Sequence, residues 1–164
     1  MNGVTRDYTG RQVDLECLQT VFDPVGVVEL SLTATRGTSR RVTGVQKAVQ
    51  RYVSLLLTPS SSVPFPDDDG NLLFAALRTG SVSDLGYLRL LFNAANAVAL
   101  DTIRKDDYNI SRFGDQRDDE RIASVTLAGM TIDHATSTLG LSLTFRTEAG
   151  SDYAYTIPVQ TRRG

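Results

Sequence analysis

Cysteine and histidine are almost absent from this sequence. Cys17 is the only cysteine and His134 the only histidine among 164 residues. One cysteine cannot build an internal disulfide framework. One cysteine with one histidine also cannot supply the three or four converging ligands of a usual zinc site. We therefore expect no disulfide, no metal and no cofactor, and assembly in the cytosol.

Long apolar runs and an excess of one charge are missing as well. The chain holds 17 basic and 19 acidic residues, a net charge of -2. Its nearest approach to a basic cluster, Arg36, Arg40 and Arg41, is typical of a solvated loop. No apolar run reaches the roughly 18 residues of a membrane helix, and no signal-peptide pattern begins the chain. Neither a nucleic acid nor a membrane is therefore expected as a partner.

The residues that are present suit a globular domain. With 41% hydrophobic and 22% charged residues, a chain of this length can bury roughly two-thirds of its unfolded surface. Residues 1–42 show little regular pattern except at 28–33, where apolar and polar residues alternate as in a half-buried strand. We therefore divide the chain into an N-terminal arm with one strand, residues 1–42, and an α+β domain, residues 43–164.

A helix, a loop and a second helix are predicted to begin this domain. Thr43 and Gln46 form a capping-box pattern at the start of the first helix, and Pro59 ends it. The aspartates at 67–69 are placed to cap the second helix, at residues 72–77. Both helices are short and amphipathic.

One long helix and three strands follow. Ser81 and Asp84 repeat the capping pattern before a segment of about 25 residues in which apolar side chains recur with a period of about 3.6. The period then changes to two in three segments, at residues 122–130, 139–145 and 153–159. These elements predict an α+β fold, with a small, mostly antiparallel sheet and two short helices and one long helix packed on one face.

Two groups of residues stand in a distinctive order along this domain. The first helix runs into Leu-Leu-Thr-Pro, a proline loop follows, and an acidic residue with glycine precedes the second helix. These residues are Leu55, Leu56, Leu57, Thr58, Pro59, Pro64, Pro66, Asp69, Gly70 and Leu73. The second group, Asp119-Glu120-Arg121-Ile122, lies between the long helix and the strands.

This order resembles the small baseplate-wedge subunits of contractile phage tails, a family sometimes described as lysozyme-like. The resemblance covers residues 43–160. Asp119 to Ile122 resembles the family's Glu-Pro-Arg-Ile segment, with Glu120 in place of the proline. The loop reads Ser60-Ser61-Ser62 where the family often has Gly-Glu-Arg, so no role is carried over to that triplet. The fold implied by the resemblance is that of the C-terminal domain of tail-sheath proteins.

The resemblance implies a structural virion component and not an enzyme. It implies a wedge-interaction site at Asp119, Glu120 and Arg121, where a guanidinium can bind carboxylates or carbonyls of neighbouring wedge proteins. It also implies a sheath initiator, whose sheet edge accepts strands from the tail-sheath protein. The core-facing positions of that sheet would be Val125, Leu127, Leu141, Leu143, Tyr155 and Ile157. Several copies would stand in a ring in the tail baseplate, assembled in the host cytoplasm.

Two alternatives stay open. A lysozyme-like enzyme that cleaves peptidoglycan needs two carboxylates roughly 5–9.5 Å apart. The candidates are Glu16, Glu29, Asp67, Asp68, Asp69, Asp119 and Glu120. Helix caps and turns account for paired carboxylates more simply, so we assign no catalytic residue. The other alternative is a tail-completion or connector protein, which shares a helix-and-sheet build at this length.

Overall fold

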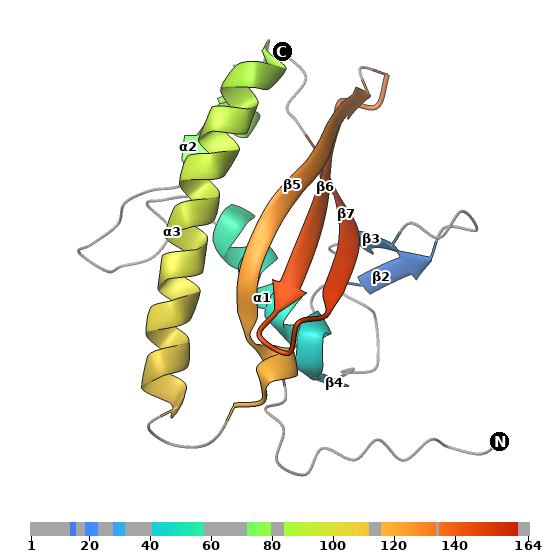
Figure 1. Ribbon diagram of the computed structural model, residues 1–164. Helices are drawn as coiled ribbons and strands as arrows, with labels where there is room; N and C mark the ends of the chain where they lie inside the picture. The colour runs from blue at the N-terminus through green and yellow to red at the C-terminus, as the bar shows by residue number, and fades with distance from the viewer. Residues whose placement is uncertain are drawn as a thin grey trace, which may run out of the picture.

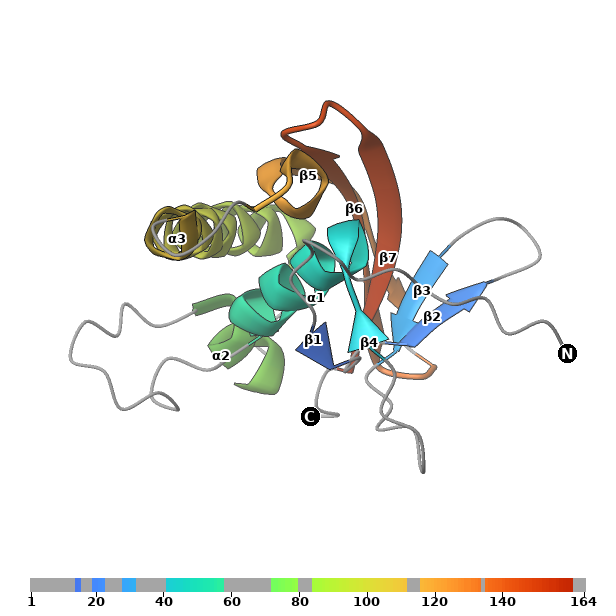
Figure 2. The same ribbon diagram turned by 90° about the horizontal axis from the view of Figure 1, so that it is seen from below.

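Helices and sheet form two layers in the computed structural model (Figure 1). The structure describes residues 14–15, 19–22, 28–31, 41–57, 72–79, 84–111, 116–133 and 135–160. Within these segments the chain forms three α-helices, one short 3₁₀ helix and seven strands. Five strands share one sheet, and the α-helices lie on one of its faces, as Figure 2 shows from below. The predicted α+β fold is confirmed.

Three long antiparallel strands make up most of the sheet. They are β5 (Ile122–Asp133), β6 (Thr138–Thr147) and β7 (Asp152–Gln160), with β6 in the centre. Two short strands, β2 (Gln19–Phe22) and β3 (Val28–Ser31), extend the sheet beyond β7, and β3 runs parallel to β7. The strand order is β2-β3-β7-β6-β5. The sheet is therefore mostly antiparallel, as predicted, and β5 lies at one of its edges.

The described residues before Thr43 contain more strands than predicted. The prediction of one strand is wrong, because four are present: β2, β3 and a separate antiparallel pair, β1 (Asp14–Leu15) with β4 (Arg41–Val42). β3 lies where alternation predicts a strand, at residues 28–33. The other three strands have two to four residues, too few to show a period in the sequence, so only their pairing reveals them. A domain boundary after residue 42 stays a prediction.

The three predicted helices are present. They are α1 (Gly44–Leu57), α2 (Leu72–Thr79) and α3 (Leu85–Ser111). α1 begins directly after Thr43, the predicted cap. At the start of α3, the Oδ1 atom of Asp84 accepts the Gly86 N–H at 2.8 Å, and the Asp84 carbonyl accepts the Leu88 N–H. Asp84 is therefore the N-cap itself, and not the third helical residue of a box begun by Ser81, which lies outside the described residues.

The hydrophobic core lies between the sheet and the helices. Phe145, at its centre, meets the ring of Tyr52 edge-on at 5.2 Å and that of Tyr155 at 5.6 Å between centroids. All six predicted core-facing positions of the sheet contribute. Val125, Leu141, Leu143 and Ile157 are buried, and Leu127 and Tyr155 are half-buried and pack against the core. The inward face of the sheet is therefore as predicted.

Two polar residues of α1 face the protein interior, although helical periodicity assigns them to solvent. Gln50 is only 4% exposed. Arg51 donates hydrogen bonds to Asp107 at 2.6 Å and to Asp106 at 2.8 Å. Burial alone would lower the pKa of Arg51, but its hydrogen bonds to the two aspartates outweigh burial and raise that pKa. The guanidinium therefore stays charged and ties α1 to the C-terminal part of α3.

Candidate assembly interface

The predicted wedge-interaction residues lie in and just after a 3₁₀ helix, η1 (Asp118–Glu120), which leads into β5. Glu120 is 3% exposed, and its Oε1 atom accepts the N–H of Gly44, the first residue of α1, at 3.2 Å. A carboxylate at this position suits the partial positive charge of a helix N-terminus. Gly44 has a φ of 62°, in the region that favours glycine. Glu120 therefore links η1 to α1 inside the protein.

Arg121 occupies the surface beside this buried carboxylate. Its side chain is 44% exposed, and its guanidinium approaches the Asp118 carboxylate at 3.8 Å. Its backbone is held on both sides, since its N–H bonds the Asp118 carbonyl and its carbonyl accepts the Glu148 N–H at 3.0 Å. The turn between β6 and β7 is thereby joined to η1. Arg121 thus presents a charged group from a fixed backbone.

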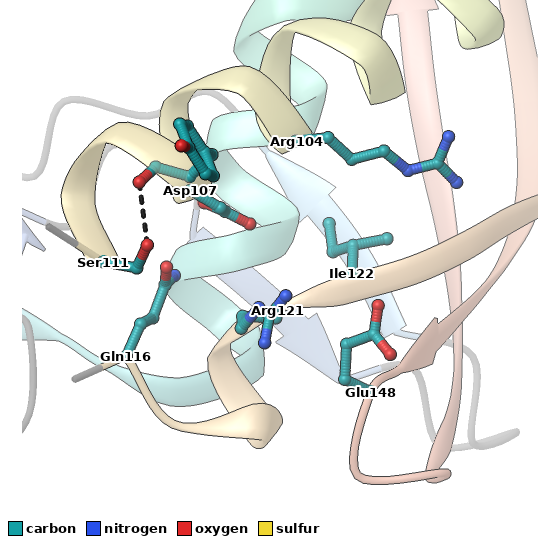
Figure 3. A pocket seen from close by; sticks show the side chains of 8 residues that line it. Arg104, Asp107, Ser111, Gln116, Arg121, Ile122 and Glu148 are labelled. Carbon is teal, nitrogen blue, oxygen red and sulfur yellow. Dashed lines mark hydrogen bonds between the residues drawn. The ribbon is translucent and has the colours of Figure 1, made fainter.

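A cavity of about 290 Å³ opens next to Arg121 (Figure 3). It lies where the end of α3, the start of β5 and the β6–β7 turn meet. Its lining residues are Arg104, Asp107, Tyr108, Ser111, Gln116, Arg121, Ile122 and Glu148. The wall therefore carries charges of both signs, and an apolar floor at Ile122. This mixture suits a polar peptide segment better than a small apolar ligand.

Two polar contacts define the wall of this cavity. Asp107 already binds Arg51, so its charge is matched within the chain. Gln116 donates from Nε2 to the Glu120 carbonyl at 3.3 Å, while its buried Oε1 atom has no hydrogen-bond partner in the described part of the chain. That oxygen is shut off from solvent, so a molecule bound in the cavity does not reach it. The cavity can therefore take a carboxylate at Arg121.

The edge of β5 forms the second part of the candidate interface. Side chains of α3 cover its first half: Asn96 Nδ2 donates to the Val125 carbonyl at 3.1 Å, and Arg104 donates to the Ala123 carbonyl at 3.3 Å. Asn96 also accepts the hydroxyl proton of Tyr52 at 2.7 Å. These side chains take the place that a neighbouring strand would occupy. Strand pairing at the edge is therefore blocked as far as Val125.

Apart from β6, no described element covers the second half of β5, which is called the open half below. In the described part of the chain, no hydrogen bond from another element apart from β6 reaches residues 127–132. Figure 1 shows β5 beside the C-terminal half of α3, and the β5–β6 hairpin leaning away from that helix. The pairing register shifts between Leu127 and Gly129, so Ala128 has no partner on β6. An edge with unpaired backbone groups can add a further strand.

Sequence reasoning missed the two residues that cover the edge. Asn96 and Arg104 lie outside the apolar stripe of α3, and periodicity alone assigns both to solvent. The two residues are about two helical turns apart and both border the apolar stripe. This spacing is a signal that would have placed both side chains along the same side of α3. The wedge-interaction residues lie together in and just after η1. The six sheet positions face the core, and Val125 and Leu127 do so from β5, the strand at the edge.

The remaining predicted residues are distributed as follows. Leu56 is fully buried in the core, and Leu55 packs against it. Outside the described residues lie Glu16, Cys17, Thr58, Pro59, Pro66, Asp67, Asp68, Asp69, Gly70 and His134. Of the other carboxylates considered for catalysis, Glu29 is described only by its backbone in β3, and Asp119 adjoins the buried Glu120 in η1.

Comparisons of the chain with family models, with curated proteins and with solved structures give no match. No helix among the described residues is both long and apolar enough to cross a membrane. The same residues contain no group of three or more side chains suited to hold a metal ion. The cavity at Arg121 and the half-open edge of β5 are therefore the features on which a functional interpretation rests.

Proposed function

We propose that this protein is a structural component of a contractile-tail baseplate wedge, which docks on other wedge proteins and initiates sheath assembly by strand pairing. The order of motifs over residues 43–160 supports the family. The open half of the β5 edge carries the mechanism, because it offers backbone groups to another chain. In this role the protein acts without catalysis, in several copies in the baseplate ring of the virion, after assembly in the host cytoplasm.

The incoming strand belongs to the tail-sheath protein and pairs with residues 127–132. An added strand of this length forms about three or four main-chain hydrogen bonds, each with a net contribution of about 0.5–1.5 kcal/mol. The side chains of Asn96 and Arg104 then mark where pairing stops. They set the register of the strand, which backbone pairing alone leaves free to slip.

The cavity at Arg121 serves the docking on other wedge proteins. A carboxylate of a partner chain binds the Arg121 guanidinium with two parallel hydrogen bonds. Arg121 stands on backbone that is fixed by η1 and the β6–β7 turn. Docking at this end leaves the open edge, near the β5–β6 hairpin, accessible to the sheath.

The test compares two proline substitutions on the same strand. Register shifts leave both Ala123 and Ala128 without a partner on β6, and proline is tolerated at such irregularities of a strand. Ala128→Pro puts a residue without an N–H in the open half of the edge. Ala123→Pro lies under α3 and is the matched control. Thermal unfolding followed by circular dichroism establishes that both variants fold.

The readouts are sheath polymerisation and hydrogen exchange with the purified full chain. We expect the wild type and Ala123→Pro to promote polymerisation of the sheath protein, and Ala128→Pro to lose at least tenfold of this effect. In the wild type, amides at 127–132 should exchange more slowly when sheath protein is added, while those at 122–126 stay unchanged. Equal polymerisation by both variants, with no new protection at 127–132, would refute the proposal.

A further inference from the structure

The solvent face of α3 carries a regular series of apolar residues that the proposed function does not use. Tyr87 is 50% exposed and Leu90 is 67% exposed, and Ala94 and Ala97 are exposed on the same face. These four residues, named here the α3 seam, are spaced by three, four and three positions. That is the spacing of the contact positions in a coiled coil, where two helices pack along their length.

The α3 seam lies opposite the face that α3 buries in its own protein. Leu88, Phe92, Ala95 and Ala99 point into the core and are at most 6% exposed. One buried apolar stripe is enough to pack a surface helix on the core of its own protein. A second apolar stripe that is exposed to solvent therefore marks an interaction site. The seam runs along about three turns of one helix, from Tyr87 to Ala97, and this shape suits another helix better than a loop or a sheet.

The order of side-chain sizes identifies the second helix. Large residues, Tyr87 and Leu90, occupy one end of the seam, and small residues, Ala94 and Ala97, occupy the other. The spacing reads the same in both directions. If a second α3 runs antiparallel, Tyr87 meets Ala97 and Leu90 meets Ala94, so every large side chain faces a small one. Facing positions that alternate large and small pack without voids.

A parallel pair would lack this fit. Tyr87 would then face Tyr87 and Leu90 would face Leu90, while Ala94 and Ala97 would face their own copies across a gap. The nearest charges in the C-terminal direction do not oppose the antiparallel pair. Asp101 binds Lys105 of the same helix at 2.6 Å, so its charge is matched before any contact forms.

We propose that the α3 seam binds a second copy of this chain, with the two α3 helices antiparallel about a twofold axis. This goes beyond the proposed function and holds with or without it. The antiparallel pairing brings residues 85–99 of the two helices side by side, because α3 begins at Leu85. These 15 residues span about 22 Å, and a strip roughly 10 Å wide buries about 220 Å² per copy. The total of about 440 Å² lies well below the 1,200–2,000 Å² of stable dimers. The dimer therefore forms only at high protein concentration, or where copies are held close together.

Sedimentation equilibrium of the full chain, from about 10 to 500 μM, tests association. We expect a concentration-dependent dimer in the wild type. Ala94→Glu places a charge in the seam and should abolish the dimer. Asn109→Glu is the matched control, because Asn109 is exposed on the same helix and lies beyond the residues that the pair brings together. It should leave the dimer unchanged. Both positions are exposed, so neither substitution disturbs the core.

Disulfide cross-linking tests the orientation, in a chain whose own cysteine is replaced by Cys17→Ser. In an antiparallel pair, residue 90 of one copy faces residue 94 of the other. A mixture of Leu90→Cys and Ala94→Cys chains should therefore form disulfide dimers at least fivefold faster than either variant alone. Faster cross-linking of each variant with itself would indicate a parallel pair and overturn the proposal.

Two further outcomes would also overturn it. The first is a wild type that stays monomeric up to 500 μM and gives no cross-link in the mixture. The second is an Ala94→Glu variant that keeps the dimer but no longer binds a wedge or sheath protein. In that case the seam holds a helix of a different chain. The Ala128→Pro experiment is independent of all these results, so failure of one proposal leaves the other standing.

Discussion

Asn96→Ala removes a side chain that joins α1, α3 and β5. Asn96 accepts the Tyr52 hydroxyl proton at 2.7 Å and donates to the Val125 carbonyl at 3.1 Å. Tyr52 is fully buried, so its hydroxyl loses a partner that water cannot easily replace, at a cost of about 1–3 kcal/mol. The lost bond to Val125 adds about 0.5–1.5 kcal/mol. We expect the free energy of unfolding to fall by about 2–4 kcal/mol in total.

Urea denaturation followed by circular dichroism measures this change, and a double-mutant cycle identifies its origin. In a Tyr52→Phe background the hydroxyl is already absent, so Asn96→Ala should cost about 1–2 kcal/mol less than in the wild type. Asn93→Ala, on the exposed surface of the same helix, is the control and should change stability by less than about 0.5 kcal/mol. The urea dependence should be unchanged in all variants, since the fold is kept.

Two results would refute this reasoning. If Asn96→Ala costs no more than the Asn93→Ala control, the two hydrogen bonds contribute nothing measurable. If Asn96→Ala costs the same in the wild type and in Tyr52→Phe, the residues are not coupled through the hydroxyl. Hydrogen exchange gives a second readout, because loss of the Asn96 side chain should expose the edge at Val125 and quicken exchange in the first half of β5.

Two further predictions concern buried ionisable groups. Burial raises the pKa of Tyr52. The buried neutral phenol therefore contributes its full stabilisation at pH values below about 10, the pKa in the unfolded chain. Above that pH the free energy of unfolding falls by about 1.4 kcal/mol per pH unit. Tyr52→Phe should therefore lose less stability than the wild type between pH 10 and 11, as urea denaturation at both pH values can measure; equal losses would contradict the prediction. Glu120→Gln should lower the free energy of unfolding by about 1–2 kcal/mol, because a neutral amide replaces the carboxylate at the start of α1. Zymography should give no peptidoglycan clearing with either form, and clearing by the wild type that Glu120→Gln loses would favour the lysozyme-like alternative.

Periodicity in the sequence was sufficient for the three α-helices and three long strands of residues 43–160, although not for the short η1. α1 ends before Pro59 because proline disfavours helix at the preceding residue. The three long strands lie where apolar residues recur with a period of two, and α3 lies where the period is about 3.6. Both periods arise because apolar side chains must reach one face of a strand or helix. The positions of Leu141, Leu143 and Ile157 in the core follow from the same rule. These features are local, so neighbouring residues suffice to predict them.

The candidate interface depended on polar residues whose partners are far away in the sequence. Gly44 and Glu120 are 76 positions apart, and Asn96 lies 29 positions from Val125. From sequence alone, a polar side chain is predicted to be exposed to solvent. Its burial can be inferred only when its hydrogen-bond partner is known. Glu120 was therefore predicted at a docking surface, and its burial at the start of α1 could not be inferred from the motif. Whether Arg121 meets a wedge protein stays a prediction.

The sequence by itself determined which segments form helices and strands and which of their faces turn inward. Tertiary structure decided where the sheet is closed and where it is open. The register shift at Ala128 moves the inward positions of β5 from Val125 and Leu127 to Met130 and Ile132. A prediction from a strict period of two would keep the odd-numbered residues facing inward along the whole strand and would miss that change. The hydrogen bonds from α3 to Ala123 and Val125 likewise form only in the fold. Which part of an edge strand stays free depends on which other elements lie against it.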